Sequence, residues 1–195
     1  MAHDDGDYAP EQVESEHGDT RGARDDCWTF AEAVETPARE REFEGVLDGC
    51  LDFTLLEAFR KTFAQGAWDG VRFWRFIDAH SRFFSPDFAR PSFLDNHDMN
   101  RFLWVAGNDK RRLELAAFCQ FTLEGPPVVY YGTEVGMSQV RDVRETSDRE
   151  ARLPMAWDDI DDSLVALYRD LAALRRRGGD VWRAGREAVV VEPDL

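Results

Sequence analysis

Short apolar segments alternate with helical patterns along this chain, and this alternation constrains the fold more than any other feature. Strand candidates lie at 27–31, 46–53, 92–94 and 127–132. Apolar residues at helical spacing lie between and after them, near 55–63, 73–84, 109–123 and 164–174. This order predicts parallel strands joined by crossover helices. A closed (β/α)8 barrel needs eight strands and roughly 250 residues, so the sequence predicts either a small open α/β sheet or half of something larger.

The last helical segment carries the clearest boundary signals. Aspartates at 158–162 precede it, Arg175, Arg176 and Arg177 finish it, and Gly178-Gly179 follows. Acidic residues at the start and basic residues at the end complement the helix dipole. The sequence therefore predicts a complete helix here.

Charge excludes one class of partner. The formal net charge is -15, and an acidic surface repels phosphate backbones, so we expect no nucleic acid partner. Arginine supplies nearly all the basic residues, which is typical of a GC-rich genome, and the acidic excess is typical of a protein hydrated in high salt.

Targeting signals are absent from the printed sequence. No run of about 18 apolar residues indicates a membrane-spanning helix, and the acidic start does not resemble a signal peptide. We therefore expect no membrane partner and a cytoplasmic location. Cys27, Cys50 and Cys119 form neither a zinc pattern nor a small disulfide framework, so buried free thiols are expected.

Residues 93–98, Phe-Leu-Asp-Asn-His-Asp, are the most informative stretch. An apolar run delivers polar side chains to a strand's C-terminal end, where parallel α/β folds bind ligands. The alternative is a strand-to-helix turn in which Asp98 or Asn100 caps a helix. Local chemistry alone leaves both interpretations open.

Three patterns in the right order resemble glycoside hydrolase family 13, the α-amylase family. Residues 93–98 followed by Arg101 resemble the end of its barrel strand 7, 125–134 resemble strand 8, and 152–157 resemble the Arg-x-Pro-Met-x-Trp segment before the last barrel helix. Upstream, 29–33 resemble strand 5, with Ala31 where Gly is common, and 47–53 resemble strand 6. The resemblance covers about 27–185.

The resemblance implies a domain organisation and an α/β fold. It predicts a partial (β/α)8 TIM barrel, about strands 5 to 8, at 27–179, and the start of a truncated C-terminal β domain at 180–195. The acidic segment at 1–26 would be the connection from strand 4 to strand 5.

The resemblance also implies roles in a retaining mechanism on α-glucans. By position, Glu32 matches the acid/base, Asp98 matches the third family carboxylate, and His97 matches the histidine that hydrogen-bonds the sugar. Trp104 is the best candidate for stacking on a sugar. Asn96 is expected to be structural, and Asp95 either solvated or capping.

The family's nucleophile lies in strand 4, in a Gly-Phe-Arg-x-Asp context that this sequence lacks. The family often continues after that Asp with a small or apolar residue and then Ala-His, and this chain opens Met1-Ala2-His3, so we expect it to start just after the nucleophile. No cofactor or metal site is evident, and calcium is possible in the intact protein.

Two functions follow as hypotheses. The first is an α-glucan hydrolase or transglycosylase, acting on starch or maltooligosaccharides, whose fragment here is inactive alone. The second is a non-catalytic half-barrel that binds carbohydrate or a partner N-terminal half-barrel.

Overall fold

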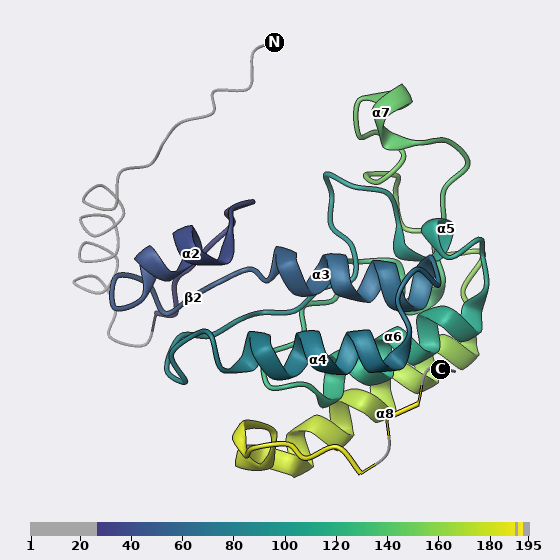
Figure 1. Ribbon diagram of the computed structural model, residues 1–195. Helices are drawn as coiled ribbons and strands as arrows, with labels where there is room; N and C mark the ends of the chain where they lie inside the picture. Colours follow the sequence, from purple (N-terminus) through teal and green to yellow (C-terminus); the bar gives the residue numbers. More distant parts are fainter. Residues whose placement is uncertain (1–26, 190, 193–195) are drawn as a thin grey trace.

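The computed structural model describes residues 27–189 and 191–192 (Figure 1). The acidic segment predicted at 1–26 lies outside the described residues. Within them, helices predominate, and regular strand is confined to two short pairs of residues.

The parallel strands predicted from the sequence are present in reduced form. β1 (Phe30–Ala31) pairs in parallel with β2 (Gly49–Cys50). Single parallel bridges continue the ladder, from Gly49 to Ala89 and from Ser92 to Pro127. The four segments therefore lie parallel and in chain order. The prediction of four full strands is wrong in extent, because the third segment (89–94) forms only two single bridges and the fourth (127–132) only one.

Gly49 is the residue at which β2 contacts both of its neighbours. It lies opposite Phe30 on one side and bridges Ala89 on the other. A Cβ at this position would lie 2.4 Å from the Ala89 carbonyl oxygen. Glycine therefore permits the close backbone approach that joins the segments.

All four helices predicted from periodicity are confirmed. They are α3 (Phe53–Phe59), which continues as a π-helical turn at Arg60–Ala64, α4 (Gly70–Ser81), α6 (Lys110–Thr122) and α8 (Asp162–Gly178). Shorter helices are α2 (Pro37–Glu40), η1 (Arg41–Phe43), α5 (Phe102–Val105), η3 (Thr133–Val135), α7 (Val143–Thr146) and η4 (Gly179–Arg183).

Aspartate caps begin the longer helices. The side chains of Asp52, Asp69, Asp109 and Asp161 accept backbone N–H groups at the starts of α3, α4, α6 and α8. These N–H groups have no partner within their own helix, so each carboxylate stabilises a helix start by about 1 kcal/mol. Several of the chain's many acidic residues thus serve to start helices.

The main core lies where α3, α4, α5, α6 and α8 meet the third parallel segment (Figure 1). Its fully buried members include Phe59, Phe102, Leu113 and Leu164, and Leu94 joins it from the segment itself. The helices predicted as amphipathic therefore bury their apolar faces together, beside the parallel segments that carry the polar loop at 95–101.

Large apolar side chains on the parallel segments remain exposed. Trp28 is 47% and Phe30 43% exposed, and their rings lie 5.0 Å apart. In the fourth segment Val128, Val129 and Tyr131 are also exposed. Since alternate residues of an extended chain share a face, Trp28 and Phe30 lie on the same uncovered face as Glu32.

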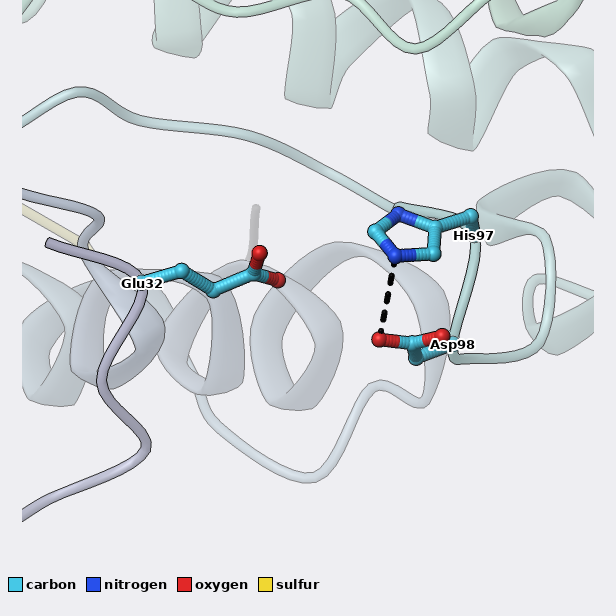
Figure 2. A group of neighbouring side chains, drawn as sticks. All are labelled: Glu32, His97 and Asp98. Atoms are coloured by element: carbon cyan, nitrogen blue, oxygen red, sulfur yellow. Dashed lines mark ion pairs between the residues drawn. The ribbon is translucent and has the colours of Figure 1, made fainter. Parts of the chain in front are cut away.

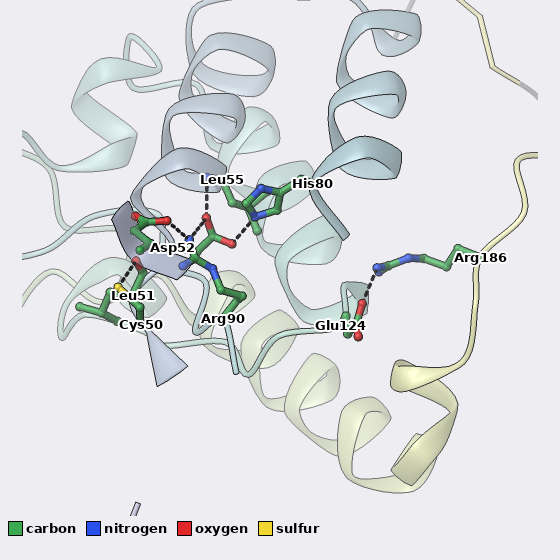
Figure 3. Close-up of polar contacts among 9 residues, drawn as sticks. Cys50, Leu51, Asp52, Leu55, His80, Arg90, Glu124 and Arg186 are labelled. Carbon is green, nitrogen blue, oxygen red and sulfur yellow. Dashed lines mark hydrogen bonds and ion pairs between the residues drawn. The ribbon is translucent and has the colours of Figure 1, made fainter. Parts of the chain in front are cut away.

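A buried charge cluster connects α2, α3, α4 and the third segment (Figure 3). Arg90 Nη2 donates to Glu40 Oε2 at 2.8 Å and to Asp52 Oδ1 at 3.1 Å, and His80 Nε2 lies 2.7 Å from Asp52 Oδ2. Burial raises the pKa of Glu40 despite Arg90. Burial acts in the same direction on Asp52, but the His80 hydrogen bond and the Arg90 charge outweigh it and lower the pKa of Asp52.

The C-terminal part departs from the expected pattern. α8 ends at Gly178, η4 follows, and residues 184–189 and 191–192 form no helix or strand. The C-terminal β domain expected at 180–195 therefore stays a prediction. No helix among the described residues is long and apolar enough to span a membrane.

Candidate active site

Three of the predicted site residues converge. Glu32 follows β1, and His97 and Asp98 follow the third parallel segment. One carboxylate or imidazole atom from each lies within 4.8 Å of the others (Figure 2). The cluster lies beyond the carboxyl ends of two parallel segments, which is where (β/α)8 enzymes place catalytic groups. Glu32 and Asp98 are exposed and His97 is half-buried.

Arg152, whose role was not predicted from the sequence, contacts both His97 and Asp98. His97 Nε2 lies 3.2 Å from Asp98 Oδ2 (Figure 2). Arg152 donates from Nε to the His97 carbonyl oxygen at 3.1 Å and from Nη2 to Asp98 Oδ1. The sequence did contain a signal for Arg152, because it is the first residue of the segment at 152–157 that resembles the family pattern.

Asn96 contacts both carboxylate-bearing segments. Its Nδ2 donates to Glu32 Oε1 at 3.3 Å, and its Oδ1 accepts the backbone N–H of Asp98 at 2.9 Å. The side chain is 9% exposed. Asn96 therefore holds the polar loop against the end of β1.

Asp95 is buried, so the prediction that it is solvated is wrong and the capping alternative is confirmed. Its carboxylate accepts the backbone N–H of Phe102, the first residue of α5, at 2.8 Å and the Thr133 hydroxyl at 2.7 Å. Burial raises the pKa of Asp95, and these two hydrogen bonds oppose the rise. Asp95 thereby fixes the loop beneath His97 and Asp98.

The capping alternative is confirmed for Asn100 and not for Asp98. The residue before α5 is Arg101, and neither Asp98 nor Asn100 bonds the start of α5. Asn100 Oδ1 accepts the backbone N–H of Val143, the first residue of the later helix α7, at 2.9 Å. The Asp98 carboxylate instead contacts His97 and Arg152.

Arg101 anchors the C-terminal end of the polar loop at 95–101. It is fully buried, and its guanidinium donates to the carbonyl oxygens of Tyr131 at 2.6 Å and Ala151 at 3.0 Å. Its guanidinium carbon lies 4.3 Å from the centroid of the Tyr130 ring, which lies 6.4 Å from His97. Burial raises the pKa of Tyr130 to about 12. The loop is thus held from both ends by buried groups.

Trp104 is not brought into the cluster. It lies on α5 and is half-buried. Across the part of the chain that the structure describes, no hydrogen bond, ion pair or ring contact joins it to Glu32, His97 or Asp98. Its role as a sugar-stacking residue therefore stays a prediction.

The cluster is a poor calcium site. Calcium prefers six to eight oxygen ligands, and the three residues offer two carboxylates and one imidazole. The Arg152 guanidinium already pairs with Asp98, so a calcium ion there would meet a positive charge. The arrangement suits hydrogen bonding and proton transfer to a bound molecule better than calcium coordination.

Comparison with known proteins identifies the family. The family model described as "Alpha amylase, catalytic domain" matches residues 5–175. Alpha-amylase 2 of Dictyoglomus thermophilum is 43% identical over 152 residues, 75% of this chain and 27% of that protein. Neopullulanase 2 of Thermoactinomyces vulgaris is 30% identical over 153 residues, 72% of this chain and 25% of that protein. The chain thus spans about a quarter of these relatives' length.

Solved structures show the same fold. Cyclic α-maltosyl-(1→6)-maltose hydrolase from Arthrobacter globiformis superposes with a TM-score of 0.84 at 24% identity, over 96% of this chain and 42% of that one. The α-amylase from H. orenii gives 0.76 at 21% identity, over 91% and 41%. These proteins are TIM-barrel enzymes, so the chain has the fold of part of such a barrel. Together with the family match, these findings show that the chain belongs to glycoside hydrolase family 13, the α-amylase family.

Proposed function

We propose that the chain carries strands 5 to 8 and part of the active site of a retaining α-glucan hydrolase or transglycosylase. The observation that carries the proposal is the meeting of Glu32, His97 and Asp98 beyond the carboxyl ends of parallel segments, in a chain of family 13. The family's relatives are named for maltooligosaccharide-type substrates, which supports an α-glucan substrate class.

Each of the three side chains has its own role in the proposed reaction. Glu32 protonates the leaving glycosidic oxygen and then activates water or an acceptor sugar, as one carboxyl group of a retaining pair does. Asp98 holds the sugar and stabilises positive charge in the transition state, and His97 donates a hydrogen bond to the sugar. Their exposure leaves all three accessible to a substrate.

The nucleophile comes from outside this chain. In a retaining enzyme it would lie about 5–5.5 Å from the acid/base carboxyl, on the side away from the leaving group. Because the covalent step then has no attacking carboxylate, the chain alone is expected to hydrolyse no glucan. Clear turnover of maltooligosaccharides by the chain alone, abolished by Glu32→Gln, would overturn this part of the proposal.

The second candidate, a half-barrel that binds a partner, is favoured by the uncovered face. Exposed Trp28, Phe30 and Val128 lie on parallel segments that fill the barrel interior in a complete fold. An N-terminal half-barrel would cover this apolar surface, which otherwise favours association or aggregation. Both candidates therefore require a second half, and they differ in whether the completed barrel cleaves glucan.

A chimera separates the two candidates. This chain would replace the segment that it matches in Alpha-amylase 2 from Dictyoglomus thermophilum, so that the rest of that protein can supply the groups this chain lacks. We expect hydrolysis of maltooligosaccharides that Glu32→Gln abolishes and Glu35→Gln, the same change at an exposed residue three positions away, preserves. A cooperatively melting chimera without turnover would favour the non-catalytic function.

A further inference from the structure

We propose that Asn96 is a positioning residue that couples the Glu32 carboxyl to the loop carrying Asp98. This inference rests on the catalytic role proposed for Glu32. Asn96 bridges two segments that are far apart in the sequence, since its amide contacts the side chain of Glu32 and the backbone of Asp98.

Hydrogen-bond chemistry fixes the orientation of the Asn96 amide. The backbone N–H of Asp98 can only donate, so the atom that faces it must be the amide oxygen. The NH2 group then faces Glu32, whose carboxylate accepts. Aspartate at this position would place an acceptor against Glu32, and leucine would satisfy neither partner. Asparagine therefore matches both contacts at once.

Glu32 needs such a restraint. It is exposed at the end of a two-residue strand, and a glutamate side chain has several accessible rotamers. Among residues 27–189 and 191–192, Asn96 is the only side chain that hydrogen-bonds its carboxyl group. The amide is itself anchored, because it is nine-tenths buried and bonded to the Asp98 backbone. Asn96 thus ties the exposed Glu32 carboxyl to the backbone of the loop that carries Asp98.

The chain supplies a matched control. Asn100 lies in the same loop, donates from Nδ2 to the Asp142 carboxylate at 3.0 Å, and accepts a backbone N–H from Val143 at 2.9 Å. Its amide thus makes the same two kinds of contact as Asn96 without touching Glu32, and its Oδ1 also accepts from Gln139 Nε2 at 2.6 Å. A purely structural role would make the loss of Asn100, which has the extra contact, at least as costly as the loss of Asn96.

Kinetics in the chimera test the effect on the reaction. Misplacing a reacting group by about 1 Å can cost about 100-fold in rate, so we expect Asn96→Ala to lower kcat about 10- to 100-fold with little change in KM. Asn100→Ala should lower kcat by less than about 3-fold. Equal losses in the two variants, or an unchanged kcat in Asn96→Ala, would overturn the proposal.

Side-chain amide resonances test the bridge in the chain as it is, without any turnover. Asn96 NH2 signals are compared by NMR at pH 7 in the unsubstituted chain and in Glu32→Gln; His97, Asp98 and Arg152 also face this region and remain present in both. We expect the Asn96 NH2 signals to shift in Glu32→Gln, because a neutral amide replaces the carboxylate that accepts their hydrogen bond, while the Asn100 signals are the same in both proteins. Unchanged Asn96 signals would overturn the bridge, whatever the chimera does on glucans.

Discussion

Replacing Arg90 by methionine removes the cation from the buried charge cluster and keeps much of the side-chain volume. Arg90 pairs with Glu40, which is 0% exposed, and with Asp52, which is 1% exposed. Removing one partner from a buried ion pair typically costs about 3–5 kcal/mol, because the remaining charge is left without compensation. We therefore expect Arg90→Met to lower the free energy of unfolding by about that amount at pH 7.

The loss should shrink as the pH falls. Arg90 helps to hold the pKa of Asp52 below its usual value, so its stabilising effect is full at neutral pH and fades as Asp52 becomes protonated. Glu40, whose pKa is already raised by burial, would rise further without Arg90 and would take up a proton on mild acidification. The Glu40 effect brings the two proteins closer in stability on mild acidification, and the Asp52 effect adds to it below about pH 4, because the pKa of Asp52 in the folded chain is lowered.

Urea unfolding followed by tryptophan fluorescence at several pH values measures the effect. Arg82→Met is the control, because Arg82 is an exposed arginine paired with Asp78 and should leave the unfolding midpoint unchanged. Adding Glu40→Gln to Arg90→Met should recover part of the loss, since it removes one uncompensated charge. A loss below about 1 kcal/mol at pH 7, or one that grows toward acid, would refute the reasoning.

Three further outcomes are expected. Asp95→Ala should destabilise the fold by about 1–3 kcal/mol in the same assay, because two buried donors lose their acceptor; no loss would contradict the capping role. Gly49→Ala should cost about 1–3 kcal/mol through the clash with the Ala89 carbonyl, and an unchanged melting temperature would contradict it. Because burial raises the pKa of Cys50 to about 11 and of Cys119 to about 12, iodoacetamide at pH 8 should modify both far more slowly in the folded chain than in urea, as followed by mass spectrometry; equal rates would contradict this.

Helices were predictable because periodicity and boundary residues agree. In α8 the apolar spacing, the preceding aspartates and the closing glycines all mark the same segment, and the structure has the helix at Asp162–Gly178. Strand extent was not predictable, because a strand forms only against its neighbours. The fourth segment is rich in valine and tyrosine, yet it forms a single bridge, from Pro127 to Ser92 of the third segment, and no segment among the described residues pairs with its other side.

The cluster of Glu32, His97 and Asp98 was predictable from motif order and from the rule that parallel strands bring their carboxyl ends together. Arg152 and the bridging role of Asn96 were not, because both depend on contacts between segments far apart in the chain. Sequence spacing gives no direct measure of such contacts. Trp104 lies close to the motif in the sequence, yet its ring lies on α5 and does not contact the cluster. Proximity in the sequence is therefore no measure of proximity at the site.

The central claim is that Glu32 is the acid/base of an α-glucan active site, and leaving-group dependence in the chimera tests it most directly. Protonation matters for a sugar leaving group and hardly at all for fluoride. We predict that Glu32→Gln lowers kcat/KM for maltooligosaccharides about 100-fold or more but lowers kcat/KM for a maltosyl fluoride far less, because kcat/KM reports the step in which the leaving group departs. Equal losses on both substrates, or no loss on either, would contradict the assignment.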